Sequence, residues 1–360
     1  MRVYAVIMAG GVGSRFWPKS RETMPKQFQE FFGDKSLYQR TYQRILRIVS
    51  PENVIVVTND VQRDIAVNQL PGILGENVIA EPLGRNTAPC IAVAASAISA
   101  TTEDAVMVVL PSDHLISDEE NYISQLKEAI RLADKEHALV TLGIKPTHPE
   151  TGFGYIHCDS SNTDPEISTH GGRRVLEFKE KPDQVTAARY LESGDYLWNS
   201  GMFIWRVDVI LDELKKNLTH FSDFFVPLKE SFKTRVFNET LKEFYLRVES
   251  ISVDYAVMER AKNVLTIPSN FVWSDVGSWD ETYRLSDRDS AGNCFKGDIV
   301  GVESNNNYVW CEEKLFALVG VNDMIVVETK DAVLICSREK SQRVKEIVGI
   351  LRKRGRQDLV

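Results

Sequence analysis

The stretch Val3-Tyr4-Ala5-Val6-Ile7-Met8-Ala9-Gly10-Gly11-Val12-Gly13 decides the fold. It opens with an apolar run of the kind that forms a buried parallel strand. Glycines follow at once, and because glycine has no Cβ, the backbone N–H groups of such a loop can approach a phosphate closely. The stretch therefore predicts a strand that leads into a phosphate-binding loop, although a glycine loop alone is also compatible with an ordinary tight turn.

Strands and helices alternate over the next part of the chain. Apolar runs predict strands at 54–57, 78–80, 105–110 and 138–143, and amphipathic or small-residue segments predict helices at 36–49, 60–70, 87–100 and 119–136. Ser36 and Gln39 have the spacing of a capping box, which marks the start of the first of these helices. The alternation predicts an α/β fold, with a mostly parallel sheet and helices on both faces.

The pattern changes twice after this alternating part. From about residue 152 it becomes an α+β mixture, and from about residue 293 short strands predominate. They are expected at 298–302, 308–311, 316–319, 324–328 and 332–335, with a closing helix at 341–354. A length of 360 residues exceeds the size at which one core usually keeps growing. We therefore expect a catalytic domain over 1–290 and a small all-β domain over 291–360.

Composition excludes several classes of protein. A net charge of −8 argues against a nucleic-acid partner, which would require clustered positive charge. The apolar N-terminal run is too short to cross a membrane and continues into glycines, not into a signal-peptide cleavage region. The five cysteines are odd in number and form no C-x-x-C pair, which fits a reducing compartment. We expect a cytoplasmic protein without a nucleic-acid or membrane partner.

Two cations accompany the glycine loop. Arg15 and Lys26 would suit a triphosphate that loses pyrophosphate, because both bring positive charge to the same loop. Phe16 stands where the dinucleotide fingerprint requires its third glycine. No Gly-Lys-Ser/Thr sequence closes the loop, so it is not a P-loop either.

The motif Gly11-x-Gly13-x-Arg15-x-x-Pro18, followed by Pro25-Lys26, resembles the signature of the nucleotide-diphospho-sugar pyrophosphorylases. The longer string through Gln27-Phe28 is similar to the mannose-1-phosphate guanylyltransferase (GDP-mannose pyrophosphorylase) branch of that family. Ser14, Phe16 and Lys19 depart from the residues usual in that branch, but the glycines and the cations are intact.

This resemblance implies a set of nucleotide-binding residues: Ala9, Gly10, Gly11, Gly13, Ser14, Glu81, Pro82, Arg85, Asn86 and Thr87. The second part of the set lies in Glu81-Pro82-Leu83-Gly84-Arg85-Asn86-Thr87. A carboxylate, an amide and a hydroxyl before a helix can read the polar edges of a base. An ordinary helix N-cap by Asn86 or Thr87 is the alternative, and the two roles are compatible.

Two aspartates far apart in the sequence are candidate metal ligands. Asp113 follows the apolar run at 105–110, where open α/β sheets bind ligands, and Asp275 lies in Trp273-Ser274-Asp275-Val276-Gly277-Ser278-Trp279. Taken singly, an aspartate in either position is more often a turn or cap residue than a metal ligand. The resemblance implies that both hold Mg²⁺, which prefers one or two carboxylates together with phosphate oxygens. His114 is expected to be a supporting polar residue.

Four further segments resemble the family's motifs for the sugar-phosphate half of the site: 151–156, 178–182, 199–203 and 252–259. They imply sugar-phosphate-binding roles for Gly154, Glu180, Asn199 and Asp254, and a phosphate-binding, catalytic role for Lys181. A carboxylate and an amide suit hydroxyl groups, and an ammonium suits a phosphate. The remainder of Ser252-Val253-Asp254-Tyr255-Ala256-Val257-Met258-Glu259 is interpreted as a capped helix with Tyr255, Val257 and Met258 in the core.

The resemblance also implies an activity and an architecture. The expected reaction transfers GMP from GTP to α-D-mannose 1-phosphate by in-line attack on the α-phosphorus, with Arg15, Lys26 and Lys181 as catalytic cations and Mg²⁺ as cofactor. The expected architecture is a Rossmann-like (GT-A type) domain with a C-terminal left-handed β-helix-like domain, in a homodimer. Two alternatives stay open: the same chemistry on another nucleotide or sugar phosphate, such as glucose 1-phosphate, and a non-catalytic regulatory subunit.

Overall fold

The computed structural model describes residues 1–159, 161 and 164–360. The chain folds into two compact units. Unit 1 consists of Met1–Gly10, Thr41–Ser112 and Ile116–Trp273, and unit 2 consists of Gly11–Arg40, Asp113–Leu115 and Ser274–Val360. The predicted boundary between residues 290 and 291 stays a prediction.

Unit 1 is built on a sheet with strand order β3-β2-β1-β4-β9-β6-β10-β8-β7. The strands are β1 (Arg2–Met8), β2 (Val54–Asn59), β3 (Val78–Glu81), β4 (Ala105–Pro111), β6 (Leu139–Ile144), β7 (Tyr155–Cys158), β8 (Arg173–Lys179), β9 (Tyr196–Arg206) and β10 (Val264–Ser269). Neighbours pair in parallel from β3 through β4 and between β6 and β10, whereas β9 and β8 pair antiparallel with their neighbours. The expected mostly parallel sheet is confirmed.

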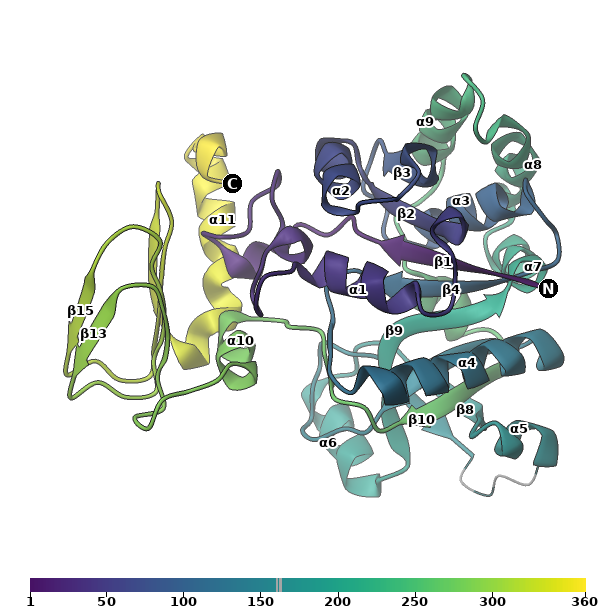
Figure 1. The fold of residues 1–360 in the computed structure, drawn as a ribbon. Coiled ribbons are helices and arrows are strands. Elements are labelled where there is room, and N and C mark those ends of the chain that lie inside the picture. Colours follow the sequence, from purple (N-terminus) through teal and green to yellow (C-terminus); the bar gives the residue numbers. More distant parts are fainter. Residues whose placement is uncertain (160, 162–163) are drawn as a thin grey trace. The chain divides into compact units, whose positions relative to one another are not determined.

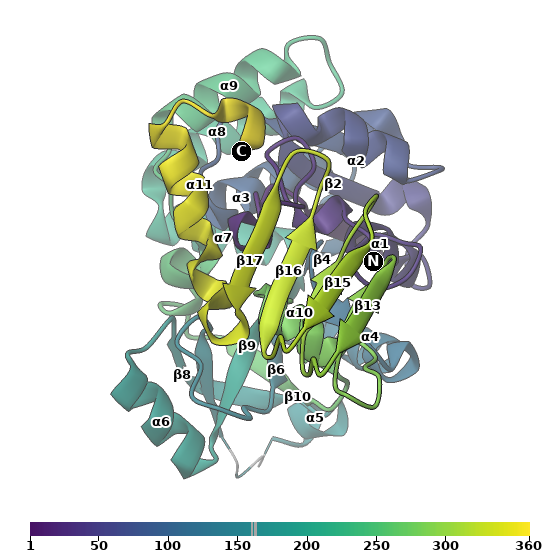
Figure 2. The same ribbon diagram turned by 90° about the vertical axis from the view of Figure 1, so that its left-hand side faces the viewer.

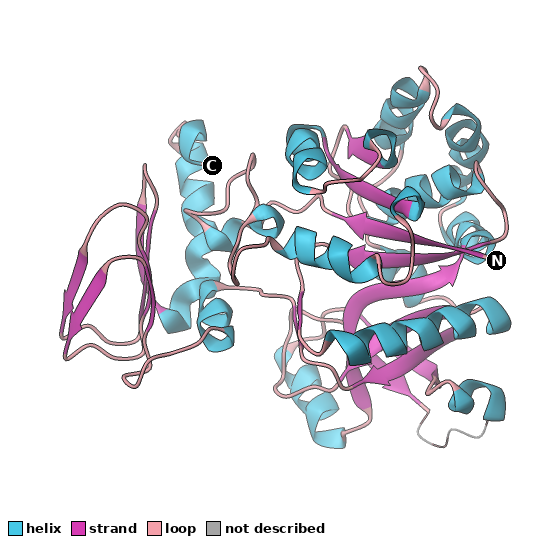
Figure 3. Ribbon diagram, in the orientation of Figure 1, coloured by secondary structure: helices cyan, strands magenta, loops and turns pink. Residues whose placement is uncertain are grey.

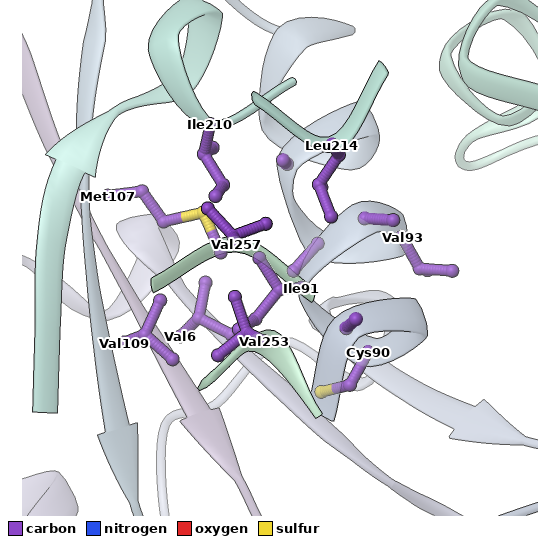
Figure 4. Packing of buried hydrophobic residues seen from close by; sticks show 14 of the residues in the cluster. Val6, Cys90, Ile91, Val93, Met107, Val109, Ile210, Leu214, Val253 and Val257 are labelled. Carbon is purple, nitrogen blue, oxygen red and sulfur yellow. The ribbon is translucent and has the colours of Figure 1, made fainter. Parts of the chain in front are cut away.

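Helices cover both faces of this sheet (Figure 1). Unit 1 contains α2 (Arg63–Gln69), α3 (Thr87–Ser99), α4 (Glu119–Glu136), α5 (Pro165–Thr169), α6 (Gln184–Ser193), α7 (Val207–Asn217), α8 (Ser222–Ser231) and α9 (Phe237–Arg247). The small-residue helix α3 is apolar on all sides, which is typical of a buried helix. It packs with α7, α8 and α9 in one large apolar cluster on the sheet face that carries Val6, Met107 and Val109 (Figure 4). Helix α4 packs on the same central strands without joining that cluster, so it covers the opposite face.

Most of the sequence-based elements are confirmed, with two differences. The capping box forms as expected, since Ser36 Oγ accepts from Gln39 N at 3.2 Å and Gln39 Oε1 accepts from Ser36 N at 2.9 Å. The helix it starts, α1 (Leu37–Ile45), is shorter than the predicted 36–49, because the chain tightens into i→i+3 turns near Ile48. The helices α5, α7 and α8 and the strand β10 were not expected from the sequence.

Unit 2 contains the C-terminal strands β12 (Cys294–Lys296), β13 (Ile299–Val302), β14 (Tyr308–Trp310), β15 (Phe316–Val319), β16 (Met324–Glu328) and β17 (Val333–Ser337). β12, β14 and β16 pair in parallel, as do β13 and β15, and β17 closes the first set antiparallel (Figure 2). Stacked parallel strands joined by short turns form a β-helix-like domain. Asn305 and Asn322 stack in successive turns and bond to each other at 3.0 Å.

Unit 2 also contains 3₁₀ turns and two α-helices (Figure 3). They are the 3₁₀ turns Ser14–Phe16, Lys26–Phe28, Arg338–Arg343 and Gln357–Leu359, and the α-helices α10 (Trp279–Leu285) and α11 (Val344–Lys353). Phe16, Trp17 and Phe31, which flank the glycine loop, share an apolar core with Trp279 and Tyr308. The loop segment is therefore anchored in the same unit as the C-terminal strands. Among the described residues, no helix is long and apolar enough to cross a membrane.

Candidate active site

The glycine loop (Gly11–Arg15) of unit 2 requires glycine at one position in particular. Gly13 has φ +61°, and a Cβ on it would lie 2.6 Å from the Cβ of Lys26. Side chains secure the loop on both sides, because Ser20 Oγ donates to the Val12 carbonyl at 2.7 Å and Gln27 Nε2 donates to the Gly11 carbonyl at 2.9 Å. Gly13 thus allows the loop to pass directly over Lys26.

Lys26 joins the two predicted metal ligands. Its buried Nζ donates to Asp113 Oδ2 at 2.8 Å and to the backbone carbonyl of Asp275 at 2.5 Å. Burial alone would raise the pKa of Asp113, but the charges of Lys26 and His114 outweigh it and hold that pKa below its ordinary value. Unit 2 therefore brings Lys26, Asp113 and Asp275 together beside the glycine loop, with Asp113 ionised.

The acidic groups at this point fit a cation that also takes ligands from a substrate. Within the described ranges, no group of three or more His, Cys, Asp or Glu side chains could hold a metal ion by itself. Mg²⁺ is usually bound by one or two carboxylates plus phosphate oxygens and water, so it does not need such a group. The carboxylates of Asp113 and Asp275 supply oxygen ligands of the right type.

Arg15 differs from Lys26 in its surroundings. Its side chain is exposed and makes no hydrogen bond or ion pair with any residue that the structure describes. Ser14, beside it on the same 3₁₀ turn, is partly exposed. A charge that has no partner in the described part of the chain remains available to an anionic ligand.

The predicted nucleotide residues of unit 1 gather around Glu81, at the end of β3. Tyr245 of α9 donates its hydroxyl hydrogen to Glu81 Oε1, and a Cβ on Gly10 would lie 3.1 Å from Glu81 Oε2. Burial raises the pKa of Glu81 to about 7, although the hydrogen bond from Tyr245 opposes this shift. Ala9, another predicted nucleotide-binding residue, uses both of its backbone polar groups within the fold. Its N–H donates to the Val57 carbonyl, and its carbonyl accepts from the Thr58 hydroxyl.

The rest of the nucleotide loop (Glu81–Thr87) leads into α3. Pro82 is partly exposed, and Arg85 Nε donates to the Tyr245 carbonyl at 3.2 Å. Asn86 caps the helix by accepting from Thr87 N at 2.9 Å, so the capping role is confirmed. Asn86 has φ 67° and ψ −166°, a region that almost only glycine occupies. The loop is therefore strained at the residue that starts the helix.

The five predicted sugar residues converge in unit 1, and we call them the sugar group. A Cβ on Gly154 would lie 2.5 Å from Glu180 Oε2, and the Gly154 carbonyl accepts from Asn199 N at 2.8 Å. Asn199 Nδ2 donates to Asp254 Oδ1 at 2.9 Å, and Lys181 Nζ donates to Glu180 Oε1 at 2.7 Å. Segments separated by up to a hundred residues of sequence thus meet at one cluster.

Comparison with known proteins shows the family to which the chain belongs. A family model described as "Nucleotidyl transferase" matches residues 4–291, and one described as "MannoseP isomerase/GMP-like beta-helix domain" matches residues 297–351. The chain belongs to the nucleotidyl transferase family. It is 41% identical over 345 residues to a mannose-1-phosphate guanylyltransferase of Salmonella montevideo, covering 95% of this chain and 72% of the relative. It is 40% identical to a relative of the same name from Escherichia coli strain K12, covering 99% of this chain and 75% of that one.

A solved structure is similar over nearly the whole length. It is described as a mannose-1-phosphate geranyltransferase from Thermus thermophilus, with a TM-score of 0.86 and 31% identity over 98% of this chain and 100% of that chain. The Rossmann-like α/β core with a C-terminal β-helix-like domain is therefore the family's fold as well as this chain's. Enzymes of the nucleotidyl transferase family generally use divalent metal ions.

Two carboxyl groups, of the buried Glu180 and the half-buried Asp254, lie in the sugar group of this nucleotidyl transferase. Burial, and then the nearby charge of Glu180, raise the pKa of Asp254 to about 7. Lys181, whose side chain is half exposed, has a pKa above its ordinary value because its bond to Glu180 outweighs the cost of burial. Lys181 also has φ +47°, so a strained residue marks this group too.

Asp275 has a strained neighbour as well. Val276 is buried with φ +47°, which is a genuine outlier for a β-branched residue. Ser274 secures the turn, since its Oγ accepts from Val276 N at 2.8 Å and donates to Glu281 of α10 at 2.6 Å. The strain is located directly beside the predicted metal ligand.

Sequence reasoning missed two residues that hold the site in place. Tyr245 orients Glu81, and Glu259 Oε1 accepts from the backbone N–H of Glu180 at 2.9 Å. Glu259 had been interpreted as an ordinary helix residue, and that interpretation was wrong. The expected core position of Tyr255 was also wrong: its side chain is 41% exposed, because residues Asp254–Met258 form a π-helical turn that directs it outward.

Proposed function

We propose that this chain transfers GMP from GTP to α-D-mannose 1-phosphate and releases GDP-mannose and pyrophosphate. The observation that carries the proposal is the Lys26 ammonium, which contacts both Asp113 and Asp275 beside the glycine loop. The names of relatives that are about 40% identical over nearly the full chain support the choice of substrates.

In this reaction a phosphate oxygen of mannose 1-phosphate forms a bond to the α-phosphorus of GTP. The bond from that phosphorus to the pyrophosphate oxygen breaks, and pyrophosphate leaves with the electron pair. The attacking phosphate is largely ionised near neutral pH, so no general base is required. Catalysis of this kind consists mainly of positioning and charge stabilisation.

Each proposed cation has a distinct role. Lys26, fixed by Asp113, and the exposed Arg15 would stabilise the charge that develops on the departing pyrophosphate. Lys181 would orient the phosphate of the sugar. Asp113 and Asp275 would hold Mg²⁺, which when bound neutralises charge on the phosphate oxygens.

The remaining residues would bind the two organic parts of the substrates. The nucleotide loop, with the Glu81 carboxylate and the polar groups of Asn86 and Thr87, would read the base and the ribose. Gly10, Gly11, Gly13 and Ser14 would contact the phosphates of GTP. In the sugar group, Glu180, Asn199 and Asp254 would bind hydroxyl groups, and the backbone of Gly154 would contact the ring.

We also propose a homodimer and a cytoplasmic location. The paired strands β13 and β15 expose Val300, Val302 and Val319 by 53%, 53% and 73%, and a second copy of the chain would cover these apolar side chains. All five cysteines are free thiols, which fits a reducing compartment.

The test is a pyrophosphate-release assay that combines each of four nucleoside triphosphates with mannose 1-phosphate or glucose 1-phosphate, with and without Mg²⁺. We expect the highest kcat/KM with GTP and mannose 1-phosphate, and no release without a divalent ion. A higher kcat/KM with another pair would replace the proposed substrates. No release with any pair would show a non-catalytic binding protein.

A further inference from the structure

A single segment of unit 1, residues 251–259, contacts both the nucleotide loop and the sugar group. On the nucleotide side, the Ile251 carbonyl accepts from Ala88 N at 3.1 Å. In a second hydrogen bond the segment supplies the donor: Val253 N donates to Thr87 Oγ1 at 2.9 Å. Two hydrogen bonds therefore fix the start of α3, directly after the strained Asn86, to this segment.

The same segment supports the sugar group. Asp254 Oδ1 accepts from Asn199 Nδ2, and Glu259 Oε1 accepts from Glu180 N, both at 2.9 Å. The second bond fixes the backbone directly before the strained Lys181. Val253 and Asp254 are consecutive, so the bond to the nucleotide loop and the bond to the sugar group leave the segment from adjacent residues.

The π-helical turn Asp254–Met258 explains how both acidic residues reach the sugar group. In an α-helix, side chains five positions apart point about 140° away from each other. Here the backbone closes a wider turn, in which Glu259 N donates to the Asp254 carbonyl at 3.0 Å. A bond across five residues stacks the two positions, so their side chains reach Asn199 and Glu180 from one side.

Apolar packing holds the segment rigidly against the sheet. Val253 and Val257 are fully buried and lie in the core with Ile91 of α3 and with Val6 and Val109 of the central strands (Figure 4). A shift of the segment would disturb this packing. The two ends of the segment must therefore move together. The nucleotide loop and the sugar group are both hydrogen-bonded to this one rigid element.

We propose that residues 251–259 couple the two substrates, with Thr87 and Glu259 as positioning residues: nucleotide bound at the Glu81–Thr87 loop tightens binding of the sugar phosphate, and the reverse. The inference rests on the proposed function for the roles of the two groups. Because the segment is rigid, a ligand that sets one of its ends in the binding position also sets the other end, which makes the coupling positive and reciprocal.

The test measures binding, not turnover. The Kd of mannose 1-phosphate is determined by calorimetry with Mg²⁺, with and without saturating α,β-methylene-GTP, which cannot react. In the wild type we expect the analogue to lower this Kd about fivefold or more. Thr87→Val keeps the shape of the side chain but removes the hydroxyl that accepts from Val253, and should bring the ratio of the two Kd values to about 1.

Matched variants separate coupling from general damage. Thr87→Ser retains the hydroxyl and should retain the ratio. Tyr245→Phe weakens the support of Glu81 without touching the segment, so it should weaken binding of the analogue and leave the ratio unchanged. At the other end of the segment, Glu259→Leu removes the oxygen that accepts from Glu180 N and should bring the ratio of the two Kd values to about 1. Glu259→Gln, whose amide oxygen still accepts from Glu180 N, should retain the wild-type ratio. This second pair of variants tests the coupling if Thr87→Val does not fold.

A wild-type ratio of 1, or an unchanged ratio in both Thr87→Val and Glu259→Leu, would overturn the coupling while the proposed function stands. If the wild type binds neither ligand, the proposed function fails instead. The ratio is then measured with the nucleotide analogue and sugar phosphate that correspond to the preferred pair in the pyrophosphate-release assay.

Discussion

The ammonium of Lys26 lies 2.8 Å from the carboxylate of Asp113, and this ion pair is the centre of the proposed phosphate chemistry. Lys26 is buried, whereas 38% of the Asp113 side chain is exposed. Asp113 can therefore reach a ligand while it neutralises a lysine that water does not solvate. The ion pair contributes both to the stability of the fold and to the proposed chemistry. These two contributions can be separated only by comparing variants.

Replacement of Asp113 tests the metal assignment. Asp113→Asn should lower kcat on the order of 10²–10³-fold, because it removes a charge that would hold the divalent ion and leaves Lys26 without its counter-ion. Pyrophosphate release, measured over a range of Mg²⁺ concentrations, checks this expectation. Asp118→Asn, at an exposed helix cap nearby in the sequence, is the matched control and should leave kcat unchanged. Asp113→Asn with more than about a tenth of the wild-type rate would contradict the assignment.

Two glycines of the same loop should respond differently to alanine. Gly13→Ala places a Cβ 2.6 Å from that of Lys26 at a backbone position with φ +61°, so it should lower the free energy of unfolding by about 1–3 kcal/mol. At Gly11 a Cβ would meet nothing within 4 Å, so Gly11→Ala should leave the melting temperature unchanged. If the Gly11 backbone approaches a phosphate, that variant should still raise the KM for GTP. Equal melting temperatures for the two variants would contradict the packing argument.

Local sequence signals predicted most of the alternating strands and helices because they require no knowledge of distant contacts. The capping box of Ser36 and Gln39 and the small-residue helix after Asn86 are both determined by neighbours within a few positions. The shorter end of α1 shows the limit of such signals. Ile48 and Val49 continue the apolar stripe, but they are β-branched and precede Pro51, which disfavours further helix.

The site could be predicted only where a motif carried it. Tyr245 bonds to Glu81 across 164 residues, and nothing in the local sequence around Tyr245 indicates that contact. The π-helical turn Asp254–Met258 inserts a residue into what is otherwise an amphipathic helix pattern, so Tyr255 was assigned to the wrong side. The left-handed conformation of Val276 is imposed by tertiary packing against the preference of its own side chain.

The pKa of Glu81 predicts opposite effects of pH on stability and on nucleotide binding. Its folded-state value of about 7 lies above the ordinary 4.5 because burial favours the protonated form. The stability contributed by this group is complete below pH 4.5 and is lost as the pH rises through about 7. Glu81→Gln cannot ionise. As the pH rises from 4.5 to 7, its free energy of unfolding should therefore increase by about 3 kcal/mol relative to that of the wild type.

Nucleotide binding should change in the other direction. If the Glu81 carboxylate binds the base, the wild-type Kd for α,β-methylene-GTP should rise as the pH falls below about 7, and Glu81→Gln should bind weakly at every pH. Tyr245→Phe removes a bond that favours the carboxylate, so its midpoint should lie at a higher pH than that of the wild type. Denaturant unfolding and calorimetry over this pH range check both effects. A wild-type Kd that is independent of pH would exclude Glu81 as a ligand of the base.

The strain at Asn86 gives a prediction in which stability and activity separate. Asn86→Gly should raise the free energy of unfolding by about 1 kcal/mol, because φ 67° and ψ −166° suit glycine and glycine caps a helix almost as well as asparagine. The same change removes the amide proposed to read the nucleotide, so the KM for GTP should rise while the Kd for mannose 1-phosphate alone stays unchanged. Asn121→Gly, in the first turn of α4, is the control and should be destabilising, because no left-handed backbone favours glycine there and the bond from Asn121 Nδ2 to Asn270 is lost. A lower denaturation midpoint in Asn86→Gly would show that the amide, and not the backbone strain, dominates at this position.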